Sequence, residues 1–267
     1  MYTSYWGLQR QPFDNVPSQE FFYRSSQHEE ALLRLVYAVE HSKGLAVLTG
    51  EVGAGKTTIS RVLYDYLNMD GYEVVTLVNP SLEPVDFLRA VLMKLGVDTA
   101  QDASKSVVLD QLNERLIQNA SQDIKTILVI DEAHLVRDKP ILEELRMLLN
   151  LQHNNQFLLT LILMGQPPLA GNLKLMKPLK ERIAIQFDLK PLDERDTMRY
   201  ILYRLKHAGA SRGIFTKDAI PPIYAFSKGI PLRINNVCER SLLMGMMRKA
   251  VNINKKIVNI AVADISR

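Results

Sequence analysis

Apolar and polar positions follow two different patterns along this chain, and the pattern changes near residue 190. Before that point, runs rich in apolar or β-branched residues predict strands at 44–49, 73–79, 126–131, 157–165 and 184–189. Between them, apolar residues recur at helical spacing in 57–67, 84–95, 107–117 and the segment that begins at Pro140. Strands that alternate with helices predict a parallel sheet covered by helices on both sides.

After Pro191 the strand pattern stops. Three helices are expected at 193–207, 217–226 and 232–249, with breaks at Gly209–Gly213 and Gly229–Pro231. The predicted fold class is therefore α/β. A parallel-sheet core would occupy residues 1–190, with the N-terminal segment 1–43 included, and a small helical lid domain would occupy residues 191–267.

The amino-acid composition indicates the general class of protein but not its function. Apolar residues make up 47% and charged residues 23% of 267 residues, which is ordinary for a soluble globular protein. The single cysteine, Cys238, excludes an internal disulfide and fits a reducing compartment, and its apolar surroundings favour an inert core thiol over a reactive one. The longest apolar run, 157–164, is shorter than the ~20 residues that span a bilayer. We expect no integral membrane segment and a place in the cytoplasm or at the surface of the inner membrane.

The net charge of +4 is concentrated in the last part of the chain. From Arg240 to Arg267 the basic residues outnumber the acidic ones, of which Asp264 is the single example. This basic tail predicts either a solvated helix face or a contact with nucleic acid or an anionic membrane.

The stretch GEVGAGKT, residues 50–57, fits the phosphate-loop pattern G-x-x-x-x-G-K-[ST] at every fixed position. It follows a predicted strand and opens a predicted helix, which is the context that the pattern requires. Lys56 would reach the β- and γ-phosphates, and the Thr57 hydroxyl would bind Mg²⁺. The predicted nucleotide-binding residues are Gly50, Glu51, Val52, Gly53, Ala54, Gly55, Lys56, Thr57 and Thr58.

Two adjacent acids follow the buried run TILVI. Asp131 is expected to hold Mg²⁺ or its water at the carboxyl edge of the sheet, and Glu132 to polarise the water that attacks the γ-phosphate. The chain has no N-K-x-D motif of the kind that recognises guanine, so ATP hydrolysis is favoured over GTP binding. His134 could sense the site or be a surface histidine.

Three further residues are candidates for the catalytic site. Gln166 directly follows a predicted strand and could orient the attacking water, or it could be a turn residue before Pro167. Arg182 could reach the active site of the next subunit and stabilise the transferring phosphoryl group, although Lys180 competes for that role. Arg233 could close on the γ-phosphate from the same chain and couple nucleotide state to the lid.

Taken together, these motifs resemble an AAA+ ATPase, and more narrowly the general secretion pathway protein A (ExeA/GspA) family. The resemblance covers nearly the whole chain and rests on YWGLQRQPFDNVP, FFYRSSQHEEALLRLVYAV, LTGEVGAGKTT, LVIDEAHL, LILMGQPPL, LKERI and GIPLRINNVCE. It implies that Pro12, Phe13 and Tyr23 lie near the adenine, although core packing explains them as well. Family members are expected to continue into a transmembrane segment and a peptidoglycan-binding domain, neither of which occurs before Arg267.

Two functions compete; the first follows from this resemblance, and the second from a similarity to AAA+ transposon ATPases. The first is an ATPase that forms a nucleotide-dependent homo-oligomer and drives a protein partner in a secretion, pilus or other cell-envelope system. The second is a transposition regulator that oligomerises on double-stranded DNA and recruits a transposase. The basic tail and the run Lys174, Lys177, Lys180 and Arg182 favour the second. A nucleotide switch without turnover is disfavoured by Glu132.

Overall fold

The computed structural model describes residues 1–16, 19–68, 71–78, 82–136, 139–174 and 176–266. The chain divides into two compact units, each of which is assembled from separated segments. Unit 1 comprises Met1–Glu29, Glu51–Thr58 and Lys190–Arg267, and unit 2 comprises Glu30–Gly50 and Ile59–Leu189. Each unit has its own hydrophobic core.

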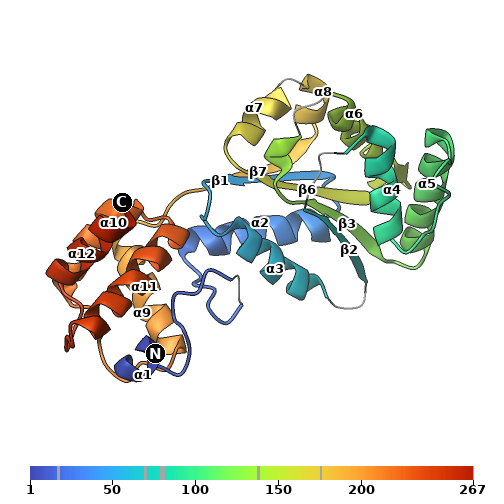
Figure 1. Cartoon of the computed structure of the whole chain (residues 1–267). Coiled ribbons are helices and arrows are strands. Elements are labelled where there is room, and N and C mark those ends of the chain that lie inside the picture. The colour runs from blue at the N-terminus through green and yellow to red at the C-terminus, as the bar shows by residue number, and fades with distance from the viewer. Residues whose placement is uncertain (17–18, 69–70, 79–81, 137–138, 175, 267) are drawn as a thin grey trace. The chain divides into compact units, whose positions relative to one another are not determined.

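Unit 2 is built on a five-stranded parallel sheet with strand order β2-β3-β6-β1-β7 (Figure 1). The strands are β1 Leu45–Gly50, β2 Tyr72–Leu77, β3 Lys125–Ile130, β6 Leu159–Gly165 and β7 Ile183–Leu189. β1 and β6 are buried along their whole length, as expected for central strands covered on both faces. The predicted parallel sheet is confirmed.

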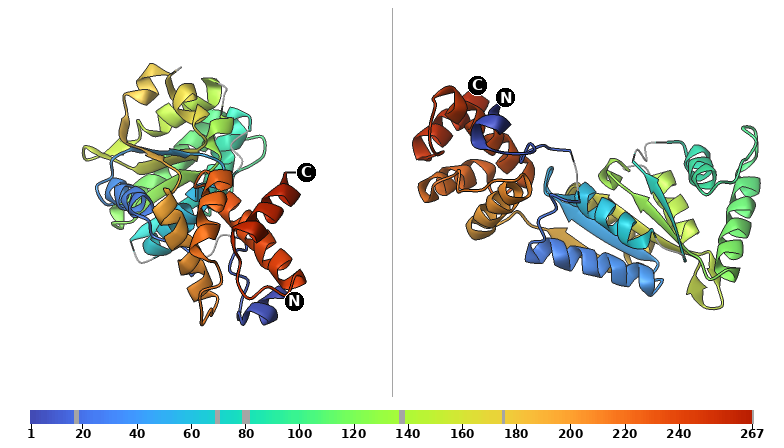
Figure 2. Two further views of the ribbon diagram at one scale, coloured as in Figure 1. Left: turned by 90° about the vertical axis from the view of Figure 1, so that its left-hand side faces the viewer. Right: turned by 90° about the horizontal axis from the view of Figure 1, so that it is seen from below.

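Helices cover both faces of this sheet (Figures 1 and 2). Alternate strand residues such as Val47, Ile130 and Leu163 point toward the helices on one face. These helices are α4 Pro84–Lys94, α5 Lys105–Ser121, α6 Lys139–Leu148, α7 Pro168–Lys174 and α8 Lys177–Lys180. The opposite face is covered by α2 Ser26–Glu40 and α3 Lys56–Leu67.

The predicted strand 157–165 begins too early, because β6 starts at Leu159. Residues Gln156–Phe157 form a short strand β5 that pairs antiparallel with β4, Gln152–His153. Asn154 and Asn155 connect the two with φ angles of 50° and 62°, which asparagine tolerates in a tight hairpin turn. The predicted strand 73–79 ends at Leu77, and Asn79 lies outside the described residues.

Unit 1 is helical in its C-terminal segment. It contains α9 Glu194–His207, the 3₁₀ turn η2 Lys217–Ala219, α10 Ile220–Ser227, α11 Pro231–Met247 and α12 Lys255–Ile265. The three predicted helices correspond to α9, η2 with α10, and α11. Cys238 is fully buried in α11, and burial raises the pKa of its thiol well above the ordinary value, so it belongs to the core.

The predicted placement of the N-terminal segment differs from the structure. Residues 1–43 were expected with the sheet core, whereas Met1–Glu29 group with the helical segment 190–267. The reason is apolar burial: α1 Tyr2–Trp6 and Phe13 lie in the same core as α9 and α11. The indole N–H of Trp6 also donates a hydrogen bond to the carbonyl of Leu242 at 3.0 Å.

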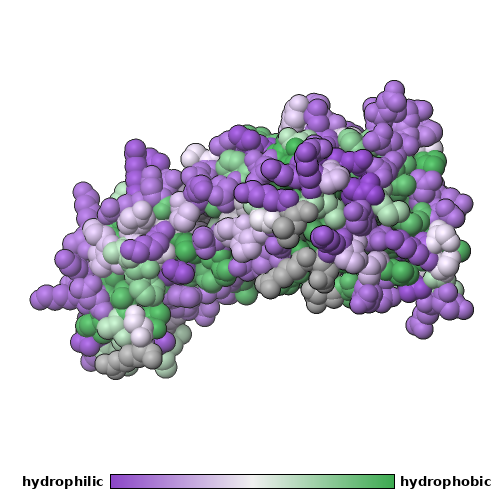
Figure 3. Space-filling view, turned by 90° about the horizontal axis from the view of Figure 1, so that it is seen from above, coloured by the Kyte–Doolittle hydropathy of each residue, from purple (hydrophilic) through white to green (hydrophobic). Residues whose placement is uncertain are grey.

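The basic tail is part of this core. α12 buries Ile257, Val258 and Ala261, and Arg240 forms an ion pair with Asp264 at 3.1 Å. Lys255 and Lys256 are exposed, while Arg267 lies outside the described residues. Within the described part of the chain, no helix is long and apolar enough to cross a membrane. The face shown in Figure 3 is largely hydrophilic, with apolar side chains in small separate areas.

Candidate nucleotide-binding site

The carboxyl ends of three neighbouring strands carry the predicted site residues. β1, β6 and β3 are adjacent and parallel, so Gly50, Gly165 and Ile130 end at the same edge of the sheet. The next residues in the chain are Glu51, Gln166 and Asp131. In open parallel sheets, ligands bind at this edge.

The loop that follows β1 has a backbone that depends on glycine. Gly53 and Gly55 have φ angles of 78° and 106°, in a region that other residues rarely adopt. A Cβ atom on Gly53 would lie 2.3 Å from Cβ of Leu232, and one on Gly55 would lie 2.9 Å from Nε2 of His28. Within the loop, the Ala54 N–H donates to the Glu51 carbonyl at 3.1 Å. The two glycines are therefore needed for both conformation and space.

Lys56 begins α3 and is 5% exposed. Its Nζ donates a hydrogen bond to the carbonyl of Glu51 at 3.0 Å, so the ammonium group lies over the loop. Ala54 is buried, whereas Val52 and Thr57 are exposed and Thr58 is half-buried. The ammonium, the loop N–H groups and the start of α3 supply the positive charge that a phosphate requires.

The backbone of Asp131 continues the hydrogen bonding between β3 and β2 by one residue. Its N–H donates to the Leu77 carbonyl at 2.9 Å, and its Oδ1 accepts the N–H of Glu132 at 2.9 Å. Glu132 has a φ angle of 53°, a left-handed conformation that is strained for a residue with a side chain. Strain of this kind is enriched at active sites, and it also occurs in ordinary turns such as the helix end at Lys228.

His134, in the 3₁₀ turn η1 Ala133–Leu135, is buried rather than on the surface, with 8% exposure. Its Nδ1 lies 3.2 Å from Oε2 of Glu132, at an angle that does not make a hydrogen bond. Asn172 donates from Nδ2 to the His134 carbonyl at 3.1 Å, and a Cβ on Gly165 would lie 2.9 Å from the His134 nitrogen. The His134 backbone is thus fixed against β6 and α7.

Gln166 follows β6 directly, as predicted. Its carbonyl accepts the N–H of Leu169 at 2.9 Å at the start of α7, and its side chain is half-buried. Arg233 is the third residue of α11 and is exposed. Among the described residues, the Arg233 guanidinium has no hydrogen-bond or ion-pair partner.

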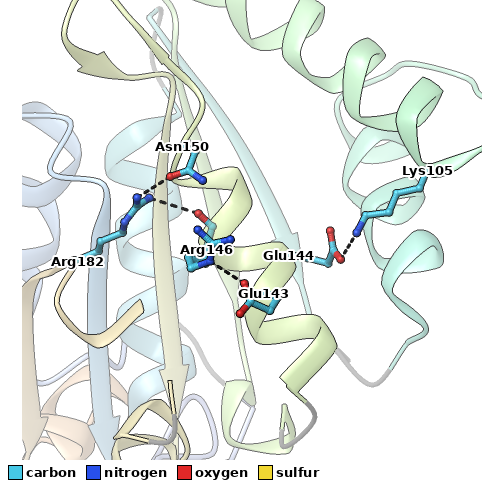
Figure 4. A network of polar contacts seen from close by, with 6 residues as sticks. All are labelled: Lys105, Glu143, Glu144, Arg146, Asn150 and Arg182. Carbon is cyan, nitrogen blue, oxygen red and sulfur yellow. Dashed lines mark hydrogen bonds and ion pairs between the residues drawn. The ribbon is translucent and has the colours of Figure 1, made fainter. Parts of the chain in front are cut away.

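Arg182 is held by the end of α6 (Figure 4). Its guanidinium donates to the Arg146 carbonyl at 3.3 Å and to Oδ1 of Asn150 at 2.5 Å. Neighbouring contacts fix the same helix, because Arg146 pairs with Glu143 at 2.6 Å and the buried Glu144 pairs with Lys105 at 2.5 Å. Lys180, its competitor, is exposed.

Phe13 lies in the core of unit 1. Its ring is fully buried and contacts Phe215 edge-to-face, with centroids 6.2 Å apart. The Tyr23 hydroxyl donates to Oδ1 of Asp196 at 3.1 Å, and burial raises its pKa. These contacts support core packing for Phe13, which was the alternative to a place near the adenine.

Sequence reasoning missed one buried residue beside the loop. His28, 4% exposed, places Nε2 3.0 Å from the Ala54 carbonyl and Nδ1 2.7 Å from the Ser25 hydroxyl. On the other side of the loop, the Leu232 N–H donates to the Gly53 carbonyl at 3.2 Å. Ser25 precedes α2 as a helix-capping residue would, but no local pattern signals a contact between residues 28 and 54.

Comparison with known proteins identifies the family of this chain. The AAA domain family matches residues 39–173. The chain belongs to this family. By fold and family it is a P-loop ATP hydrolase of the AAA+ class. It is 35% identical over its whole length to General secretion pathway protein A of Aeromonas hydrophila, of which it spans about half, 49%.

Solved structures with the same fold are more distant in sequence. The Aeropyrum pernix ORC1 protein, solved in complex with DNA, is 19% identical, with a TM-score of 0.69 over 96% of this chain and 69% of that chain. The Thermotoga maritima RuvB Holliday junction branch migration motor is 21% identical, with a TM-score of 0.60 over 94% of this chain and 72% of that chain. These likenesses establish the AAA+ fold, an α/β P-loop core with a helical C-terminal part.

Proposed function

We propose that this AAA+ chain binds ATP and Mg²⁺ and hydrolyses ATP at the boundary between its own subunits, driving assembly or remodelling of a cell-envelope system such as a secretion apparatus. The single observation that supports nucleotide binding most strongly is the loop 50–57, with its positive-φ glycines and Lys56 lying over it. The envelope system is supported by the 35% identity to General secretion pathway protein A.

The donor atoms in this chain fit the expected ligands. The loop N–H groups and Lys56 would bind the phosphates. The Thr57 hydroxyl and the Asp131 carboxylate are hard oxygen ligands of the kind Mg²⁺ prefers. When bound, Mg²⁺ would neutralise charge on the β- and γ-phosphates.

Glu132 would accept a proton from the water that attacks the γ-phosphate, which yields ADP and inorganic phosphate. Gln166 would orient that water from the end of β6. Arg182 would act on the neighbouring subunit, and the exposed Arg233 would respond to the γ-phosphate in its own subunit. The strained Glu132 backbone and the partner-free guanidinium of Arg233 among the described residues support these roles.

The deciding experiment compares the wild-type protein with Lys56→Ala in a direct binding assay with a fluorescent ATP analogue and Mg²⁺. Oligomer size is recorded in parallel by light scattering. We expect the wild type to bind and to assemble with ATP, and Lys56→Ala to do neither. Tight nucleotide binding by a folded Lys56→Ala protein would contradict the site.

A transposition regulator that assembles on double-stranded DNA is the second candidate. Exposed Lys174, Lys177 and Lys180 on α7 and α8 favour it, because several exposed cations suit a phosphate backbone, although Lys177 also lies 3.8 Å from the carboxylate of Glu181. ATPase rate and oligomer size with and without duplex DNA, at low and moderate salt, separate the two candidates. Stimulation by DNA that disappears as salt rises would favour the regulator, and indifference to DNA would favour the envelope system.

A further inference from the structure

The carbonyl groups of the phosphate loop must point away from its ligand. A loop binds an anion because consecutive N–H groups converge on it, and any carbonyl that turns inward would repel the phosphate. In this chain, the two consecutive carbonyls of Gly53 and Ala54 each accept a hydrogen bond from outside the loop. The donor to Gly53 is a backbone N–H, that of Leu232, whereas the donor to Ala54 is a side chain, His28.

The hydrogen-bond partners define which nitrogen of His28 carries the proton. The Ala54 carbonyl can only accept, so Nε2 must be the N–H, and Nδ1 then accepts from the Ser25 hydroxyl. The Ser25 oxygen in turn accepts the His28 backbone N–H at 3.4 Å. Ser25 thus selects the tautomer that donates to the loop.

The ring also occupies the space beside the next glycine. Nε2 would lie 2.9 Å from a Cβ atom at Gly55, and the Phe22 ring contacts His28 edge-to-face, with centroids 5.8 Å apart. The imidazole is therefore held between Phe22 and the loop, with both of its nitrogens engaged. A side chain that only filled space would not need a donor at this position.

We propose that His28 is a positioning residue for the phosphate loop: its N–H holds the Ala54 carbonyl outward, so that the loop is preorganised for phosphate before ATP arrives. The inference rests on the proposed function of the same loop. Because the hydrogen bond acts on the loop and not on the reacting atoms, it should change nucleotide affinity more than turnover.

The test uses three variants of the full chain. His28→Leu removes the donor, His28→Gln keeps an amide N–H near the Nε2 position, and Ser25→Ala removes the group that selects the tautomer. The dissociation constant for a fluorescent ATP analogue, KM and kcat are measured for each, and thermal unfolding monitors the fold.

We expect His28→Leu to raise the dissociation constant and KM about tenfold, with kcat within about twofold of the wild type, since a buried hydrogen bond of this kind corresponds to roughly that change. His28→Gln should recover most of the affinity, and Ser25→Ala should show a smaller loss than His28→Leu. If the His28→Leu protein does not fold, the proposal is tested by comparing the nucleotide affinities of the Ser25→Ala and His28→Gln proteins.

The proposal would be overturned if a folded His28→Leu protein bound the ATP analogue with wild-type affinity. It would also be overturned if a folded His28→Gln protein bound the analogue as weakly as His28→Leu does. Wild-type affinity in Ser25→Ala would overturn it where His28→Leu does not fold. Failure of the proposed function has a different signature, because the wild-type protein would then bind no nucleotide or Lys56→Ala would bind it as tightly.

Discussion

Nδ1 of His134 lies 3.2 Å from Oε2 of Glu132, and the two side chains come from the strained turn that follows β3. His134 is buried and its backbone is fixed by Asn172, whereas the Glu132 side chain is exposed. The buried imidazole therefore occupies space beside the carboxylate and limits the positions that the carboxylate can adopt.

Replacing Glu132 with Gln should preserve ATP binding and reduce turnover by about 10²- to 10⁴-fold, because the amide cannot accept a proton from water. A single-turnover hydrolysis assay together with a binding assay measures both quantities. Hydrolysis at a near-normal rate would remove Glu132 as the base.

Replacing His134 with Ala should lower kcat by about tenfold and leave ATP affinity within about twofold, because Glu132 loses the neighbour that restricts it. His134→Asn, which keeps a polar atom near the Nδ1 position, is the matched control and should retain more activity. Equal losses in the two variants would show that the imidazole serves only to fill space.

Arg182→Ala should lower turnover by about 10³-fold if Arg182 acts on the neighbouring subunit. Mixing Arg182→Ala with Lys56→Ala then restores activity, because some interfaces combine an intact loop with an intact arginine. Lys180→Ala is the control. Recovery in the mixture is measured by steady-state ATPase rate, and a mixture as inactive as its components would exclude action between subunits.

Gly53→Ala should destabilise the protein by about 1–3 kcal/mol, since alanine must adopt a φ angle of 78° and its Cβ would lie 2.3 Å from Cβ of Leu232. Thermal unfolding measures the loss. Gly171→Ala in α7 is the control, because nothing lies within 4 Å of its Cβ position, and its stability should be unchanged or slightly higher.

Burial lowers the pKa of His28 from its ordinary value of 6.5, while the hydrogen bond to Ala54 and the charge of Asp196 act in the opposite direction. Below pH 6.5 the unfolded chain therefore binds more protons at this position than the folded protein. Stability is lost as the pH falls from 6.5 toward the lowered pKa, by at most about 1.4 kcal/mol per pH unit. Melting curves between pH 7.5 and 5.5 should show a larger loss in the wild type than in His28→Gln.

Much of unit 2 could be predicted from the sequence because its signals are local. The five strands of the parallel sheet appear as runs rich in apolar or β-branched residues. The phosphate loop 50–57, which belongs to unit 1 from Glu51 onward, could be predicted for the same reason, because it is a contiguous motif. The hairpin β4–β5 was missed because Phe157 extends the apolar run of β6 without being part of it.

The organisation of unit 1 could not be predicted in this way. Trp6 contacts Leu242, and His28 contacts Ala54, and no periodicity relates residues that are far apart in the chain. The helix α12 was not predicted, because the charges of residues 255–265 drew more attention than their apolar positions. Ile257, Val258 and Ala261 form a buried stripe, while Lys255 and Lys256 are exposed, which is compatible with the solvated helix face expected for the basic tail.

The separated segments of unit 1 impose an order on its folding during synthesis. Trp6 and Phe13 leave the ribosome early, whereas their core partners lie beyond residue 190. At about 5–20 residues per second, these aromatic side chains wait roughly 10–40 s for their partners. Strands β1, β2, β3 and β6 are synthesised within that interval, whereas β7 ends only at Leu189. The N-terminal aromatic side chains therefore lack their core partners until after the last strand of the sheet has been made.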